Sequence, residues 1–237
     1  MKIFIGLDDS GRGPIIGPMI LAAVAINQKQ KIFLKKVGVK DSKKLSSTTR
    51  KRLEGIIKQN CLAYKLLNIS PYEIDTREIR RINLNTLEAK KFASLINNIF
   101  FLLKEKKILE KIVGKVLVIV DCPSPNIKKW QEVLEGYIEE MVRKEIFLIV
   151  KHKAEMHTAV AAASILAKEE REREIKKIKE IIGFDFGSGY PSDERTINFL
   201  KNEFKKIKEI DEKHHFLRKT WKMENIKQKK LKEFFDQ

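Results

Sequence analysis

The sequence predicts an α/β fold, in which a five-stranded sheet is flanked by helices and followed by a helical C-terminal region. Five short apolar runs have the length and composition of buried strands. Longer stretches between and after these runs repeat their apolar residues at the spacing of amphipathic helices. The chain has 237 residues, 43% of them hydrophobic, which is enough to bury an ordinary core.

The first two expected strands, "KIFIGLD" and "MILAAVAI", are separated by a Gly- and Pro-rich turn and are expected to form a hairpin. The third is "LAYKLLNIS". The β-branched runs "KVLVIVD" and "IFLIVKHKA" are typical of central strands. The five predicted strands cover residues 2–8, 19–26, 62–70, 115–121 and 146–154.

Helical periodicity predicts helices over residues 47–59, 85–107, 127–143 and 158–182. The last of these is apolar at first and charged later, so its first half should be buried. Two further amphipathic stretches follow, one up to about Lys208 and one from about Lys222 onward. No long linker separates these stretches from the rest. We therefore expect a core over 1–182 and a helical region over 183–237 packed on it.

The charge balance favours a polyanionic partner. The chain carries 49 Lys and Arg against 32 Asp and Glu, a net charge of +17. Residues 31–52 alone hold nine basic residues and one acid. Nucleic acid is the first partner to consider. The alternative is that part of this charge is only a lysine-rich solvated surface.

A membrane or secreted protein is not expected. The N-terminus reaches charged residues too early for a signal peptide, and the longest uncharged stretch, 13–28, is short and contains Pro14 and Pro18. Cys61 and Cys122 form neither a metal-binding spacing nor a disulfide framework. We expect a soluble, cytoplasmic protein and, by default, a monomer.

Acidic residues stand at the ends of three predicted strands. Asp8 and Asp9 follow the first, Asp121 ends "KVLVIV", and Glu155 follows "IFLIVKHKA". If these strands are neighbours, the four carboxylates converge at the edge where open α/β sheets bind ligands. Clustered carboxylates repel one another unless a cation lies among them. Oxygen ligands without His or Cys favour Mg²⁺ or Mn²⁺, which can activate water against a phosphodiester. Any one acid could instead be a helix cap or turn residue.

The turn after Asp9, "GRGPIIG", does not fit known phosphate-binding loops. Its last glycine comes one residue too late for G-x-G-x-x-G, and no G-K-[ST] follows. Gly11, Arg12 and Gly13 therefore form either a plain hairpin turn or a backbone that approaches a substrate closely.

Six segments, in order over nearly the whole chain, resemble ribonuclease HII of the archaeal type. "GLDDSGRGPIIGPM" resembles the family's D-E-x-G-R-G-P motif, and "VKDSKKLS" resembles its D-S-K-K-L motif. "VDCPSP" resembles the end of the strand that carries the family's third carboxylate. "KHKAEMHTAVAAASILAKEERERE" is similar to the H-K-A-D to K-x-x-R-D segment. "FGSGYPSDERT" and "LRKTWK" match later motifs.

The resemblance implies an RNase H-like mixed sheet and an endoribonuclease that cuts 5′ of ribonucleotides in RNA·DNA hybrids or duplex DNA, leaving 3′-hydroxyl and 5′-phosphate ends. The implied metal-binding carboxylates, which would hold Mg²⁺ or Mn²⁺, are Asp8, Asp9, Asp121 and Glu155. The implied substrate-binding residues are Gly11, Arg12 and Gly13 at the 2′-hydroxyl, Tyr190 at the junction sugar, and Lys43, Ser164 and Lys168 at phosphates. Tyr190 could instead be a packing residue.

Three acids depart from the family pattern. Asp9 stands where the family usually has Glu, whereas Glu155 and Glu172 stand where it usually has Asp. Each exchange moves a carboxylate by roughly 1.5 Å. We therefore expect either that the shorter Asp9 and the longer Glu155 compensate each other across the site, or that the site prefers Mn²⁺ over Mg²⁺.

Two other functions remain open: a weak or inactive nucleic-acid-binding protein on the same fold, and another RNase H-like nuclease such as a junction resolvase. The resemblance to the archaeal branch also implies a sliding clamp as a partner, bound through a short terminal motif. The segment "LKEFFDQ" has adjacent aromatic residues but does not match that motif cleanly.

Overall fold

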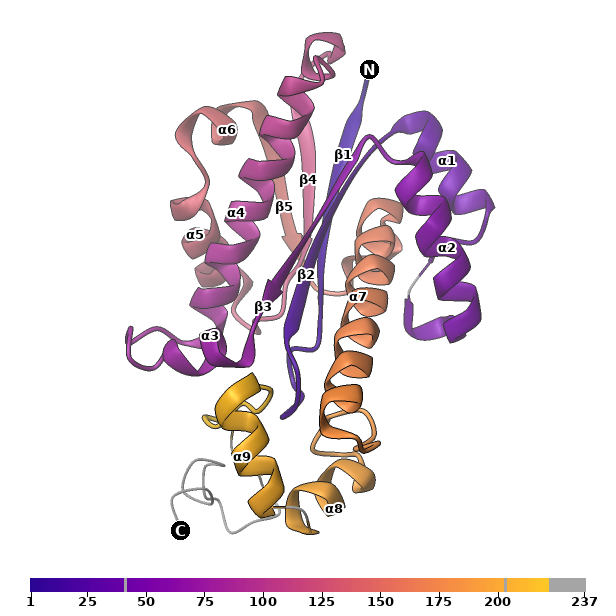
Figure 1. Ribbon diagram of the computed structural model, residues 1–237. Helices are drawn as coiled ribbons and strands as arrows, with labels where there is room; N and C mark the ends of the chain where they lie inside the picture. Colours follow the sequence, from indigo (N-terminus) through magenta and orange to yellow (C-terminus); the bar gives the residue numbers. More distant parts are fainter. Residues whose placement is uncertain (41, 203, 222–237) are drawn as a thin grey trace. The chain divides into compact units, whose positions relative to one another are not determined.

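The computed structural model describes residues 1–40, 42–202 and 204–221 (Figure 1). Within these ranges the chain forms two compact units. The first comprises residues 1–10, 20–67 and 83–169, and the second comprises 11–19, 68–82 and the residues from 170 onward. The predicted division into a core over 1–182 and a C-terminal region over 183–237 stays a prediction.

The first unit is built on a five-stranded mixed sheet with the order β3-β2-β1-β4-β5. β1 pairs antiparallel with β2, so the predicted hairpin is confirmed, and β4 runs parallel to both β1 and β5. The strands are β1 Ile3–Ser10, β2 Met19–Asn27, β3 Ala63–Ile69, β4 Val116–Asp121 and β5 Ile146–Lys151.

Helices cover both faces of this sheet (Figure 1). One face packs against α1, α2 and the apolar first half of α7, and together they bury a continuous core that includes Phe4, Leu53 and Leu166. The helices α4 and α5 lie side by side on the other face, where the Phe92 and Trp130 rings meet edge to face at 5.9 Å. The bounds are α1 Gln28–Lys36, α2 Ser47–Asn60, α4 Leu84–Glu105, α5 Ile127–Tyr137, α6 Glu140–Glu145 and α7 Thr158–Ile182.

In the first unit, the α-helices differ from the predicted ones in two places. α1 was not predicted, although Asn27 and Gln30 form a capping box at its start. The predicted helix over 127–143 is two helices, because the chain extends at Ile138 and buries that side chain. Asn97 of α4 fixes this break by accepting a hydrogen bond from the Glu139 amide at 3.2 Å.

Gly6 on β1 allows the close approach of α7. A Cβ atom at this position would lie 2.1 Å from the Ala159 carbonyl carbon and 2.2 Å from the Val160 amide nitrogen. Only a residue without a side chain fits between these backbones. The start of α7 therefore lies directly on β1, two residues before Asp8.

Gly6→Ala is expected to destabilise the protein by about 3 kcal/mol, because both neighbours of the new methyl group are backbone that cannot rotate away. Urea unfolding of the variant measures this loss. Gly55→Ala is the matched control, since a Cβ at Gly55 meets nothing within 4 Å. A loss below about 1 kcal/mol for Gly6→Ala would contradict the close approach.

The second unit contains α3 Pro71–Thr76, the second half of α7, α8 Glu194–Asn202 and α9 Phe204–His214. Its core gathers Ile15, Ile175, Phe186 and Phe199. The predicted helical stretch that ends near Lys208 corresponds to α8 and α9. The helix expected from Lys222 lies outside the described residues. No helix in the described part of the chain has the length and apolar character needed to cross a membrane.

Candidate metal centre and substrate-binding loops

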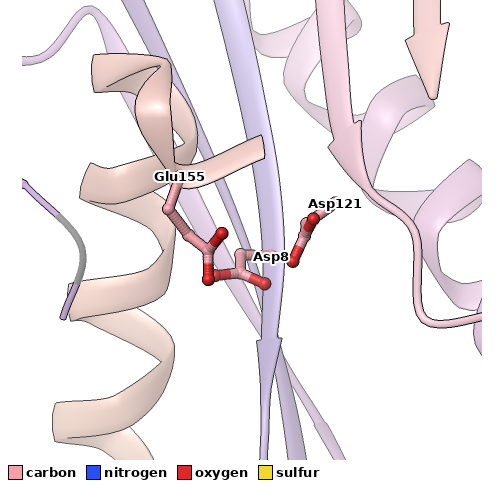
Figure 2. A group of neighbouring side chains, drawn as sticks. All are labelled: Asp8, Asp121 and Glu155. Atoms are coloured by element: carbon pink, nitrogen blue, oxygen red, sulfur yellow. The ribbon is translucent and has the colours of Figure 1, made fainter. Parts of the chain in front are cut away.

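Three acidic side chains from separate elements point toward one another in the first unit (Figure 2). Asp8 comes from β1, Asp121 from the end of β4, and Glu155 from the short 3-10 turn Ala154–Met156. Each offers a carboxylate oxygen, and these oxygens lie within 4.8 Å of one another. In the part of the chain that the structure describes, this is the group of acids arranged to hold a metal ion.

The parallel register of β1 and β4 brings the first two acids together. Leu7 pairs with Val120, and the next residue on each strand is a carboxylate, Asp8 and Asp121. Side chains at equivalent positions of paired strands share a face of the sheet. The two acids therefore project toward the same face.

Glu155 does not follow a strand directly, contrary to the prediction. β5 ends at Lys151, and the chain then folds back through Lys153, which has a left-handed backbone with φ 54°. The Ala154 amide donates to Asp121 Oδ1 at 2.9 Å, and the Cys122 amide donates to the Lys151 carbonyl at 2.9 Å. These bonds fix the turn that carries Glu155 against the end of β4.

Burial raises the pKa of two acids of this cluster, Asp8 and Asp121. Asp8 is only 5% exposed, and its desolvation, followed by the charges of Asp9 and Asp121, raises its pKa well above the ordinary value. A hydrogen bond from Ser164 opposes this effect. The pKa of Asp121 is also raised, chiefly by desolvation and also by the charge of Glu155.

The cluster fits a hard divalent cation. Its donors are all carboxylate oxygens, which Mg²⁺ and Mn²⁺ prefer. The raised pKa values of Asp8 and Asp121 indicate that burial, and after it the neighbouring like charges, disfavour the ionised carboxylates. A cation bound among Asp8, Asp121 and Glu155 would offset their repulsion.

Asp9 is not a member of this group of three. Successive residues of a strand point to opposite faces, and Asp9 follows Asp8 within β1. Its amide donates to Asp8 Oδ1 at 2.8 Å, and its charge still acts on Asp8. A role for Asp9 as a metal ligand stays a prediction.

The loop that carries Lys43 lies beside the carboxylates. Lys43 Nζ is 3.6 Å from Glu155 Oε1, while its side chain is 78% exposed. The neighbouring Ser42 bonds Ser164 of α7 at 2.9 Å between their hydroxyl oxygens. Arg50 secures the loop by donating to the Leu45 carbonyl at 3.0 Å. The exposed ammonium group of Lys43 is thus placed near the acids on an anchored loop.

The structure gives Ser164 and Lys168 different surroundings. Ser164 is buried, and its hydroxyl contacts Ser42 and Asp8, which suits a residue that orients Asp8 more than one that reaches a phosphate. Lys168 follows about one turn later on α7 and is half-buried. Phosphate contacts by either residue stay predictions.

In the second unit, Arg218 holds the turn that contains Gly11, Arg12 and Gly13. Its guanidinium donates to the carbonyls of Gly11, Arg12 and Gly17 at 2.6, 2.8 and 2.9 Å, and the side chain is fully buried. Trp221 donates from Nε1 to the Gly13 carbonyl at 3.2 Å. Because the amide and carbonyl of a trans peptide point in opposite directions, the amides of Arg12 and Gly13 face away from Arg218.

The segment "LRKTW" therefore docks inside the second unit. Leu217 forms a bridge with Ile16, and Arg218 reaches the turn. The sequence marked this segment through the family motif but assigned no role to Arg218 or Trp221. A buried arginine among carbonyls has no periodic signature, so only the structure reveals it.

Tyr190 lies in a loop whose shape Asp193 controls. Asp193 accepts hydrogen bonds from the amides of Ser188 at 2.8 Å and Arg195 at 3.0 Å. These bonds lower the pKa of Asp193 from 3.8 to about 2. The Tyr190 ring lies close to Gly13, where an added Cβ would be 3.6 Å from its Cε1 atom. Tyr190 and the Gly11–Gly13 turn are thus neighbours in the second unit.

Acid should weaken the second unit through Asp193. Because its folded-state pKa is depressed, its stabilising contribution is present above pH 3.8 and is lost as the pH falls toward about 2. Asp193→Asn should cost about 1 kcal/mol at pH 6, and the difference from wild type should shrink toward pH 2. Urea unfolding between pH 6 and 2 measures it, with Glu212→Gln as an exposed control. A pH-independent difference would contradict the prediction.

Comparison with known proteins decides the family. The sequence model described as Ribonuclease HII matches residues 5–224. The chain belongs to the ribonuclease HII family. Ribonuclease HII of Nanoarchaeum equitans is 41% identical, with 97% of this chain and 98% of that protein covered. Ribonuclease HII of Methanocaldococcus jannaschii is 37% identical, over 97% and 98% of the two chains.

Solved structures of the family agree in fold. Ribonuclease H2 from Pyrococcus horikoshii is similar with a TM-score of 0.74 at 31% identity, covering 99% of both chains. Ribonuclease HII in a PCNA complex from Archaeoglobus fulgidus is similar with a TM-score of 0.72 at 33% identity, covering 98% of this chain and all of that one. The RNase H-like sheet flanked by helices is confirmed, and this member of the ribonuclease HII family is a type HII ribonuclease H.

Proposed function

We propose that the chain hydrolyses the phosphodiester on the 5′ side of ribonucleotides, in RNA·DNA hybrids or embedded in duplex DNA, at the cluster of Asp8, Asp121 and Glu155. The observation that carries this proposal is the convergence of these three carboxylates in a member of the ribonuclease HII family. The net charge of +17 supports a polyanionic substrate. The expected products carry a 3′-hydroxyl and a 5′-phosphate.

Asp8, Asp121 and Glu155 would hold the cation, with Asp9 as a further candidate. When bound, Mg²⁺ or Mn²⁺ would supply Lewis-acid stabilisation of phosphoryl oxygens and acidify water, and the clustered carboxylates suggest that two such ions are held. Ser164 would orient Asp8, because its hydroxyl bonds that carboxylate. Lys43 would hold a phosphate of the substrate near Glu155.

The second unit would recognise the ribose. The amides of Arg12 and Gly13, turned away from Arg218, are donors suited to a 2′-hydroxyl or a phosphate oxygen. Tyr190 would stack on or bond the junction sugar. Both features support selection of ribonucleotides over deoxyribonucleotides.

The test uses three matched duplexes: one with a single embedded ribonucleotide, one of DNA alone, and one RNA·DNA hybrid. Each is incubated with Mg²⁺ or Mn²⁺, and the ends are mapped. We expect cleavage 5′ of the ribonucleotide and none of the DNA duplex. Tight binding without cleavage in the presence of either ion would favour the binding-protein alternative, and cleavage of branched DNA alone would favour a resolvase.

The same assay tests the metal preference. Equal activity and affinity with Mg²⁺ and Mn²⁺ would contradict the Mn²⁺ preference expected from Asp9 and Glu155.

A sliding-clamp contact and a cytoplasmic location are further proposals. The PCNA complex of the Archaeoglobus fulgidus relative supports the first. The candidate segment "LKEFFDQ" lies outside the described residues. Co-elution of the full chain with a PCNA-type clamp, compared with a chain truncated before Leu231, tests the contact. Equal co-elution of both chains would exclude this segment.

A further inference from the structure

Arg171 is a buried charged residue of α7 to which the proposed function assigns no role. It belongs to the second unit and is only 5% exposed. Buried arginines are uncommon and are normally paired or fully hydrogen-bonded. The surroundings of Arg171 therefore call for an explanation.

The guanidinium of Arg171 holds the Tyr190 loop at two points. Its central carbon lies 4.9 Å from the centroid of the Tyr190 ring, within the range of a cation–π contact. Its Nη2 atom donates to the Ser188 carbonyl at 2.8 Å. Arg171 thus contacts both the ring and the backbone two residues before it.

The other end of the side chain fits against the Gly11 turn. A Cβ atom on Gly11 would lie 2.5 Å from Arg171 Cδ and 2.6 Å from its Nε. Gly11 also has a φ of 86°, which favours glycine. Arg171 therefore fills the space that the missing side chain leaves, and it touches both candidate sugar-binding features.

Arg171 retains this position at an energetic cost. Its Nε is buried and has no hydrogen-bond partner among the described residues. Desolvation also lowers its pKa, which shows that the environment disfavours the charge. An apolar side chain would fill the same space without these costs, so packing alone does not explain an arginine here.

We propose that Arg171 is a positioning residue that couples the Gly11–Gly13 turn to Tyr190, so that the two act as one element on the ribose of the substrate. The proposal rests on the proposed function for its substrate. The coupling between Arg171 and Tyr190 can be tested without cleavage. Arg171 should act through Tyr190, so loss of either residue should remove the same interaction with the substrate.

A double-mutant cycle tests this coupling with Arg171→Met, Tyr190→Ala and the double variant. Two quantities are measured: kcat/KM for the duplex with one embedded ribonucleotide, and the dissociation constant for that duplex in EDTA, each relative to wild type. Arg173→Met is the matched control, because Arg173 lies on the same helix but pairs with Glu170 at the surface. Arg171→Lys keeps the charge, and circular dichroism checks the fold of every variant.

We expect Arg171→Met to lower kcat/KM for the ribonucleotide substrate by about tenfold. The double variant should lose no more than Tyr190→Ala alone, and Arg171→Lys should recover part of the loss. The proposal would be overturned if the fold-losses of the two single variants multiplied in the double variant. It would also be overturned if Arg171→Met folded and kept the wild-type kcat/KM and dissociation constant. If Arg171→Met fails to fold, the cycle with Arg171→Lys and Tyr190→Phe decides by the same criterion.

The two readouts separate this proposal from the proposed function. If wild type binds but does not cleave, the proposed function fails, and the cycle in dissociation constants still decides the coupling. If wild type cleaves but Tyr190→Ala has no effect, the coupling proposal fails and the cleavage activity stands.

Discussion

Asp8→Asn should abolish cleavage, with a loss of at least about 10³-fold, while the dissociation constant for the substrate changes little. The amide keeps the size of the carboxylate but removes the charge at the centre of the cluster with Asp121 and Glu155. Cleavage of the single-ribonucleotide duplex and binding to it in EDTA measure the two effects. Wild-type activity in this variant would refute the metal centre at Asp8.

The same variant should fold at least as well as wild type without metal. Because burial and the charge of Asp9 raise the pKa of Asp8, its ionised form destabilises the fold at neutral pH, and a neutral amide removes that penalty. Added Mg²⁺ or Mn²⁺ should raise the Tm of wild type but not that of Asp8→Asn. Glu140→Gln, an exposed acid of α6, is the control and should retain the shift. Loss of the shift in the control would indicate a non-specific ion effect.

Arg218→Met should destabilise the second unit by about 5 kcal/mol, because three carbonyls, two of them in buried hydrogen bonds, lose their shared donor. Urea unfolding followed by circular dichroism should show an early transition that wild type lacks. Arg218→Lys should recover only part of the loss, since one ammonium group cannot match the fork geometry of a guanidinium.

The control for this second prediction is Arg195→Met, which removes an exposed arginine from α8. It should unfold within about 0.5 kcal/mol of wild type. A similarly small effect of Arg218→Met would contradict its role in holding the Gly11–Gly13 turn, and the orientation inferred for the Arg12 and Gly13 amides would lose its support.

The predicted fold was accurate where the chain carries local signals. All five strands were predicted close to their bounds, because buried strands are short apolar runs between turn residues. The helix over 158–182 matches α7 at both ends. The break at Ile138 was missed, since it depends on Asn97 in a distant helix, and amphipathic periodicity continues across it.

The sequence by itself determined the residue types of the site and the family to which the chain belongs. Acids at strand ends, the glycines of the turn and the ordered motifs are all local features, so they can be read without a structure. Tertiary structure decided which groups meet. Strand register placed Asp8 and Asp121 together and left Asp9 outside the group, and a folded-back turn, not a strand end, delivered Glu155. Arg171 and Arg218 acquire their contacts with Gly11 from helices and loops more than 150 residues away, and long-range packing of that kind leaves no periodic trace in a sequence.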